Sequence, residues 1–163
     1  MRFFLDTEFI ETGALHPIMP ISIALVSEDG DEYYAEFTNV DWERAGEWVI
    51  TNVKPYLRGG NCLKDRQIIA NEIKEFVGES PEFWAYFADY DWVLMCQLYG
   101  RMVELPKTWP FFCLDIKQYM WHFGVTKEQM EIPNLQEHDA LADARWNRKA
   151  FLWMFNYQEM LQG

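Results

Sequence analysis

The stretch Phe3-Phe4-Leu5-Asp6-Thr7-Glu8-Phe9 joins an apolar run directly to two carboxylates. Successive side chains on a strand alternate between its two faces, so Asp6 and Glu8 point the same way. Two like charges on one face of a buried strand repel each other unless a cation lies between them. A divalent metal ion, which prefers oxygen ligands, meets that need. The stretch therefore predicts a metal site at the end of the first strand.

The pattern of apolar residues further along the chain predicts a mixture of strands and helices. Strands are expected over residues 2–6, 21–26, 32–37, 83–87 and 111–114, and the turn signal at residues 28–30 makes the second and third a hairpin. Helices are expected at residues 41–48, 65–78, 89–99, 115–123 and 139–161, with loops at 10–19, 55–61 and 124–136. Three early strands followed by strand–helix alternation indicate an α/β fold, in which helices cover both faces of a mixed five-stranded sheet.

Composition limits the class of protein. The chain has 163 residues, half of them hydrophobic, which predicts one globular domain over residues 1–163. A net charge of −12 argues against a protein that binds long duplexes by neutralising many phosphates, but not against a short nucleic acid held at a metal centre. No apolar run is long enough to span a bilayer. The scattered cysteines Cys62, Cys96 and Cys113 favour a reducing, cytoplasmic location.

Two more acids follow the predicted strand at residues 83–87. Asp89 is expected to cap the next helix, and Asp91 to lie in its first turn near the positive end of the helix dipole. Acids are common at helix starts, so this segment alone is typical of ordinary helix-start residues.

The third informative segment is Glu137-His138-Asp139-Ala140-Leu141-Ala142-Asp143-Ala144. His138 precedes the last predicted helix, and Asp143 lies about one turn into it. Ala140 and Ala144 share one face and are small enough to let this helix approach the sheet closely, which brings Asp143 towards the carboxylates of the first strand. Taken alone, a histidine at a helix start is usually structural and a charge on a helix usually faces solvent.

Together, and in this order, the three segments resemble the motifs of the DEDDh (DnaQ-like) 3′→5′ exonucleases, which have a ribonuclease H-like fold. Asp6 and Glu8 match the first motif of the family, Asp91 the second, and His138 and Asp143 the third. The resemblance extends from Phe3 to the final helix and is closest to the small, single-domain, bacterial-type exoribonucleases.

The second motif departs from the family pattern. Tyr86 and Phe87 stand where the family often has His-Asn, Asp89 replaces an Asn, and Tyr90 stands at the usual Phe. Asp91 keeps the ligand position, so the catalytic set is retained while the residues around the substrate differ.

The resemblance implies hydrolysis of phosphodiester bonds from the 3′ end of single-stranded or overhanging RNA, with release of nucleoside 5′-monophosphates. It implies two ions of Mg²⁺ or Mn²⁺, held by Asp6, Glu8, Asp91 and Asp143. His138 is the implied general base, because an imidazole can take the proton from a nucleophilic water.

The resemblance also suggests where the substrate binds. The backbone of Thr7 and Glu8 is expected to contact the 3′-hydroxyl, and loop 10–19 to act as a lid. Single-stranded nucleic acids are often held by base stacking. The candidates for stacking are Phe9, which we favour, and Trp84, Tyr86 and Tyr90, with core packing as the alternative for each.

Other functions stay open at this point. The nearest alternative is a 3′→5′ exodeoxyribonuclease acting on single-stranded DNA, which differs from the first reading in its response to the 2′-hydroxyl. A catalytically silent nucleotide- or partner-binding domain is favoured by the acidic balance and the altered second motif. A purely structural domain, with its acids as caps and surface charge, is the last alternative. The resemblance further implies a homodimer.

Overall fold

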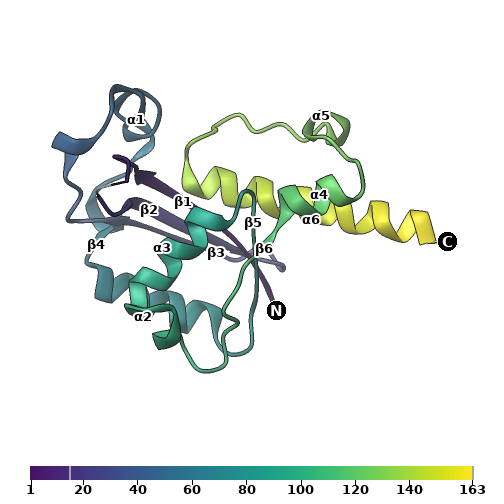
Figure 1. Ribbon diagram of the computed structural model, residues 1–163, viewed down its shortest axis with the longest axis horizontal. Helices are drawn as coiled ribbons and strands as arrows, with labels where there is room; N and C mark the ends of the chain where they lie inside the picture. The colour runs from purple at the N-terminus through teal and green to yellow at the C-terminus, as the bar shows by residue number, and fades with distance from the viewer. Residues whose placement is uncertain (15, 163) are drawn as a thin grey trace.

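The computed structural model describes residues 1–14 and 16–162 (Figure 1). Leu15, which belongs to the predicted loop 10–19, lies outside the described residues. The strands are β1 (Arg2–Ile10), β2 (Met19–Ser27), β3 (Glu32–Phe37), β4 (Leu63–Lys64), β5 (Glu82–Ala85) and β6 (Leu114–Asp115). The α-helices are α1 (Glu47–Asn52), α2 (Arg66–Val77), α3 (Asp89–Tyr99), α4 (Ile116–His122), α5 (Lys127–Met130) and α6 (Ala140–Gln162). No helix in the described part of the chain is both long and apolar enough to cross a membrane.

The strands form one mixed sheet in the order β4-β3-β2-β1-β5-β6. The central strand β1 pairs antiparallel with β2 and parallel with β5. The predicted α/β fold with a mixed sheet is confirmed, but the predicted strand count of five is wrong, because the described chain forms six strands. The additional strand is β4, whose two residues pair with the end of β3. A strand this short has no periodicity that a sequence pattern can reveal.

The alternation along the first half of β1 divides its apolar residues between two helical layers. Phe3 and Leu5 are buried in a cluster with residues of α2 and α3. Phe4 is buried on the opposite side, in a cluster with residues of α4 and α6. Figure 1 shows α2 and α3 on one side of the sheet and α4 and α6 on the other. Helices therefore cover both faces, as predicted.

Several predicted boundaries are wrong. β1 continues to Ile10 rather than ending near residue 6, because its pairing with β2 runs past the two carboxylates. The predicted helix 41–48 is instead a 3₁₀ turn, Trp42–Arg44, followed by α1. The predicted strand 111–114 is reduced to β6, and the predicted loop 124–136 contains α5. Asp89 is the first residue of α3 rather than its cap, a position that Ala88 occupies.

The last helix, α6, lies close against the sheet. Ala140 and Ala144 are fully buried in a cluster with Ala24 and Val26 of β2, as their small size predicts. The side chain of Asn147 donates a hydrogen bond of 2.8 Å to the main-chain oxygen of Leu5 in β1. This bond satisfies a buried amide and fixes the register of α6 against the central strand.

We predict that Ala144→Leu destabilises the protein by about 1–3 kcal/mol, because added methylene groups in a packed interface force the helix outward. Urea denaturation would measure the loss. Ala142→Leu, on the same helix but only partly buried, serves as the control and should change stability much less. Equal destabilisation by the two substitutions would contradict the close packing of α6.

Candidate active site

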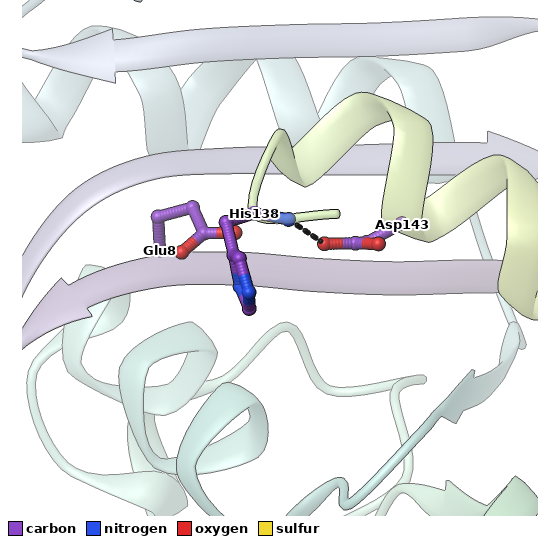
Figure 2. A group of neighbouring side chains, drawn as sticks. All are labelled: Glu8, His138 and Asp143. Atoms are coloured by element: carbon purple, nitrogen blue, oxygen red, sulfur yellow. Dashed lines mark hydrogen bonds between the residues drawn. The ribbon is translucent and has the colours of Figure 1, made fainter. Parts of the chain in front are cut away.

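A cavity of about 300 Å³ lies where the end of β1 meets the starts of α3 and α6. Five of the side chains that line it are the candidates from the three sequence motifs, Asp6, Glu8, Asp91, His138 and Asp143. The candidate substrate-binding residues Thr7 and Phe9 line it as well. Figure 2 shows Glu8 on the strand facing His138 and Asp143 from the beginning of α6.

The strand side of the cavity contains a β-bulge. The pairing of β1 with β2 shifts register between Glu8 and Phe9, where Pro20 stands opposite Phe9. Proline in a sheet is found mainly at edges and bulges because it lacks an N–H donor. Bulges bend a strand and redirect its side chains, and they are frequent beside active sites. The bulge here sets the orientation of Glu8 and Phe9 relative to Asp6.

Asp91 is held from the opposite face of β1. It lies in the first turn of α3 and is almost completely buried. One of its carboxylate oxygens accepts hydrogen bonds from the amide of Thr7 at 2.8 Å and from the Thr7 hydroxyl at 2.5 Å. Both donors of Thr7 are thus engaged by Asp91. Contact of Thr7 with the substrate stays a prediction, and its observed partner is this carboxylate.

The start of α6 holds Asp143 through two donors. One oxygen of Asp143 accepts from the amide of His138 at 2.8 Å (Figure 2), and the other accepts from the side chain of Asn134. His138 has a left-handed backbone with a φ of 72°, a conformation that is costly for a residue with a side chain and is frequent at active sites. Ligand atoms of Glu8, His138 and Asp143 all lie within 4.8 Å of one another.

Asp139, next to His138, already has a positively charged partner for its carboxylate. Its carboxylate pairs with Arg58 at 3.0 Å. One of its oxygens also accepts from the amides of Leu141 and Ala142 at 2.9 and 3.2 Å, which caps α6. Asp139 is therefore a neutralised structural acid beside the cavity.

The remaining carboxylates repel one another. Burial, together with the charges of Asp91 and Asp143, raises the pKa of Asp6 well above its usual value. Burial and the charge of Asp143 raise the pKa of Glu8 to about 8. Burial raises the pKa of Asp91 to about 7, although the hydrogen bonds from Thr7 oppose the shift. Burial also raises the pKa of Asp143. Such shifts at clustered acids in a cavity are typical of functional sites.

The chemistry of this cluster fits a divalent cation. Within residues 1–14 and 16–162, no Lys or Arg forms an ion pair with Asp6, Glu8, Asp91 or Asp143. Several carboxylate oxygens on opposing elements are the donors that Mg²⁺ and Mn²⁺ prefer. A bound cation would also relieve the repulsion that raises these pKa values.

Aromatic side chains form one wall of the cavity. Phe9 stacks on Tyr90, with ring centroids 5.3 Å apart, and Tyr86 and the well-exposed Phe87 line the cavity beside them. Trp84 was expected among the stacking candidates, but it packs on Phe151 away from the cavity. It lies on β5, whose alternation directs it against the core cluster of α4 and α6, where it is partly buried.

Two residues of the site carry no sequence signal. Trp48 of α1 approaches His138 edge-on, with ring centroids 4.7 Å apart. Asn134 comes from the segment before α6 and bonds to Asp143. Neither lies in a recognisable motif, and only the tertiary fold brings them to the cavity. In the predicted lid, Glu11 accepts a hydrogen bond of 3.2 Å from the Tyr90 hydroxyl.

The sheet order and the helical layers define a ribonuclease H-like fold. Solved structures of exonuclease I have this fold. One aligns with a TM-score of 0.65 at 16% identity, over 96% of this chain and 42% of that chain. A zinc-bound form of the E. coli enzyme in complex with single-stranded DNA aligns with a TM-score of 0.68 at 14% identity, over 96% and 40%. The chain therefore spans about two fifths of the length of exonuclease I.

The chain belongs to the family described as the 3′-5′ exoribonuclease Rv2179c-like domain, which matches residues 1–155. A relative from Mycobacterium tuberculosis strain H37Rv, the 3′-5′ exoribonuclease Rv2179c, is 43% identical over 157 residues, which cover 93% of this chain and 91% of the relative. The 3′-5′ exoribonuclease MT2234.1 of strain CDC 1551 matches equally well. The predicted ribonuclease H-like fold and the predicted 3′→5′ exoribonuclease family are confirmed.

The raised pKa values predict how stability depends on pH without metal. A carboxyl group whose pKa is raised on folding binds more protons in the native state than in the unfolded state, so stability falls as pH rises between the two values. For Glu8 that interval runs from 4.5 to about 8. In EDTA, the melting temperature should therefore decrease across this interval.

Asp6→Asn removes one of the repelling charges and should raise the melting temperature above the wild-type value at the upper end of the interval. Addition of Mn²⁺ to the wild type should reverse most of the decrease, because the ion binds the native state only. A melting temperature that does not change with pH or with Mn²⁺ would show that the carboxylates do not interact as described.

Proposed function

We propose that this protein is a metal-dependent 3′→5′ exoribonuclease that shortens single-stranded or overhanging RNA and releases nucleoside 5′-monophosphates. One observation carries the proposal. In a chain of an exoribonuclease family, Asp6, Glu8, Asp91, Asp143 and His138 line a single cavity at the end of the central strand. We also propose that residues 1–163 act as one exonuclease domain.

The four carboxylates would hold two divalent ions, Mg²⁺ or Mn²⁺. When bound, such ions activate a water molecule and stabilise the charge that develops on the phosphate oxygens. The structure of the related fold in E. coli exonuclease I contains a zinc ion, which supports a divalent cation as the cofactor. Asp6 and Glu8 supply ligands from β1, Asp91 from α3 and Asp143 from α6.

His138 accepts the proton from the attacking water in this proposal. Its imidazole is positioned by the edge contact with Trp48, and its own amide fixes Asp143. Thr7 orients Asp91 through two hydrogen bonds. The terminal base would extend the stack of Phe9 on Tyr90, since stacking on aromatic rings contributes about 1–3 kcal/mol per base.

A 3′→5′ exodeoxyribonuclease is the second candidate. The exonuclease I structures with the same fold were obtained with single-stranded DNA or a DNA oligonucleotide, which favours it. The names of the relatives that are 43% identical favour RNA. Because the identity is higher and covers most of both chains, we place RNA first.

Two further predictions concern the cell and the assembly. The cytoplasmic location stays a prediction, supported by Cys62, Cys96 and Cys113, which are free thiols. The homodimer also stays a prediction. It is supported by the exposed apolar side chains of Phe155, Met160 and Leu161 near the end of α6.

End-labelled RNA and DNA of equal sequence would test the activity. With Mn²⁺, the 5′-labelled RNA should give a ladder that shortens from the 3′ end, and the DNA should be cut more slowly. EDTA or Asp6→Asn should abolish the ladder. Faster degradation of DNA would support the second candidate, and no degradation of either substrate would favour a silent binding domain.

His138→Gln should lower kcat by about 10²–10⁴ if the imidazole is the general base. His122 is an exposed histidine on α4. The substitution His122→Gln is the matched control and should leave kcat unchanged. Circular dichroism would verify that both variants are folded. Equal activity of the two variants would remove His138 from the mechanism.

A further inference from the structure

The catalytic cavity is too small for more than the end of a strand. Its volume of about 300 Å³ is at the lower end of the roughly 300–1,000 Å³ typical of small-molecule sites. It suits a terminal nucleotide, and the rest of an RNA must lie outside it. Among the described residues that line the cavity, none is Lys or Arg. Each further nucleotide nevertheless adds a phosphate charge that needs a favourable partner.

Two more cavities continue from the catalytic one along α6. The first, of about 220 Å³, shares Asp6 and His138 with the catalytic cavity and adds Lys127. The second, of about 520 Å³, shares Asn134 and Trp146 with the first. We refer to these two cavities together as the α6 groove. The shared lining residues make the three cavities neighbours in a series that begins at the carboxylates.

Three positive side chains line the α6 groove in a protein with a net charge of −12, and the acids Asp6, Glu137 and Asp143 also line its inner part. Lys127 lines its inner part, and Arg145 and Lys149 line its outer part. Lys127 pairs with Glu137 at 2.7 Å, and Arg145 pairs with Glu32 at 2.6 Å, so both are partly neutralised.

Lys149 differs from the other two cations. It is exposed and forms no ion pair with any acid of residues 1–14 and 16–162. Leu135, which is 90% exposed, stands at the rim of the same cavity. Lys149 and Leu135 line the same cavity, so the cation would meet a phosphate while the apolar side chain packs against a base, the two groups that alternate along a single strand.

We propose that the α6 groove binds the single-stranded RNA on the 5′ side of the scissile phosphate, with Lys149 contacting a phosphate and Leu135 packing against a base. The proposal rests on the proposed exonuclease function and adds the path that the bound RNA takes across the protein. The aromatic wall at Phe9 and Tyr90 then receives the terminal base, and the backbone leaves the carboxylates towards the positive side chains of α6.

The length of the substrate provides the test. Lys149→Ala and Lys149→Glu should lower kcat/KM severalfold more for an RNA hexanucleotide than for a dinucleotide, with the larger loss for the reversed charge. For the hexanucleotide, Lys149→Ala should also make the slope of log(kcat/KM) against log[NaCl] shallower by about 0.7, the value of one lost phosphate contact on a single strand.

Lys107→Ala and Lys107→Glu are the matched controls. Lys107 is exposed and lines a separate cavity of about 670 Å³ that shares no lining residue with the three described here. These variants make the same changes in net charge and should leave the ratio of the two kcat/KM values unchanged.

Two outcomes overturn the α6 groove alone. In the first, the wild-type enzyme degrades both RNAs, but the Lys149 variants lower kcat/KM equally for the hexanucleotide and the dinucleotide. In the second, the Lys107 variants change the ratio of the two kcat/KM values as much as the Lys149 variants do. A wild-type protein that degrades neither RNA with Mn²⁺ overturns the exonuclease function itself, and the groove with it.

Discussion

Four carboxylates that repel one another lie together in this fold, and the surrounding structure has to offset their repulsion. Asp6 and Glu8 lie on the central strand, Asp91 on a helix on one face of the sheet and Asp143 on a helix on the other. Placing like charges in a half-buried cavity raises the free energy of the native state. The rest of the structure holds these groups in place despite that cost, which is the usual relation between a functional site and its scaffold.

The scaffold offsets the cost with neutral hydrogen bonds and close packing. Thr7 of β1 donates hydrogen bonds to Asp91, and His138 and Asn134 donate to Asp143. Asn147 of α6 donates to the main-chain oxygen of Leu5 in β1. The neighbouring acid Asp139 differs from these carboxylates because it forms an ion pair with Arg58. The geometry of the cluster is thus fixed although no Lys or Arg of the described residues pairs with its carboxylates, and a bound metal ion would supply the missing positive partner.

The sequence predicts the parts of the fold that depend on local periodicity. The early strands, the helix at α3 and the long α6 follow from alternation and helical spacing, and the order of three short motifs locates the acids that line the cavity. β4 and the bulge at Glu8 depend on pairing between distant segments, so no local pattern reveals them. The same holds for Trp48 and Asn134, which reach the cavity through tertiary packing. It also holds for Trp84, which packs against the core cluster of α4 and α6 instead of lining the cavity.

The bond between His138 and Asp143 joins the two residues through the main chain of one and the side chain of the other. The imidazole therefore carries no part of the attachment that orients Asp143. In the proposed mechanism, the side chain of His138 takes part in the chemistry while its main chain anchors Asp143, and only the first of these roles depends on the identity of the side chain. A family could exchange this ring for another proton acceptor and still retain the geometry of the neighbouring carboxylate.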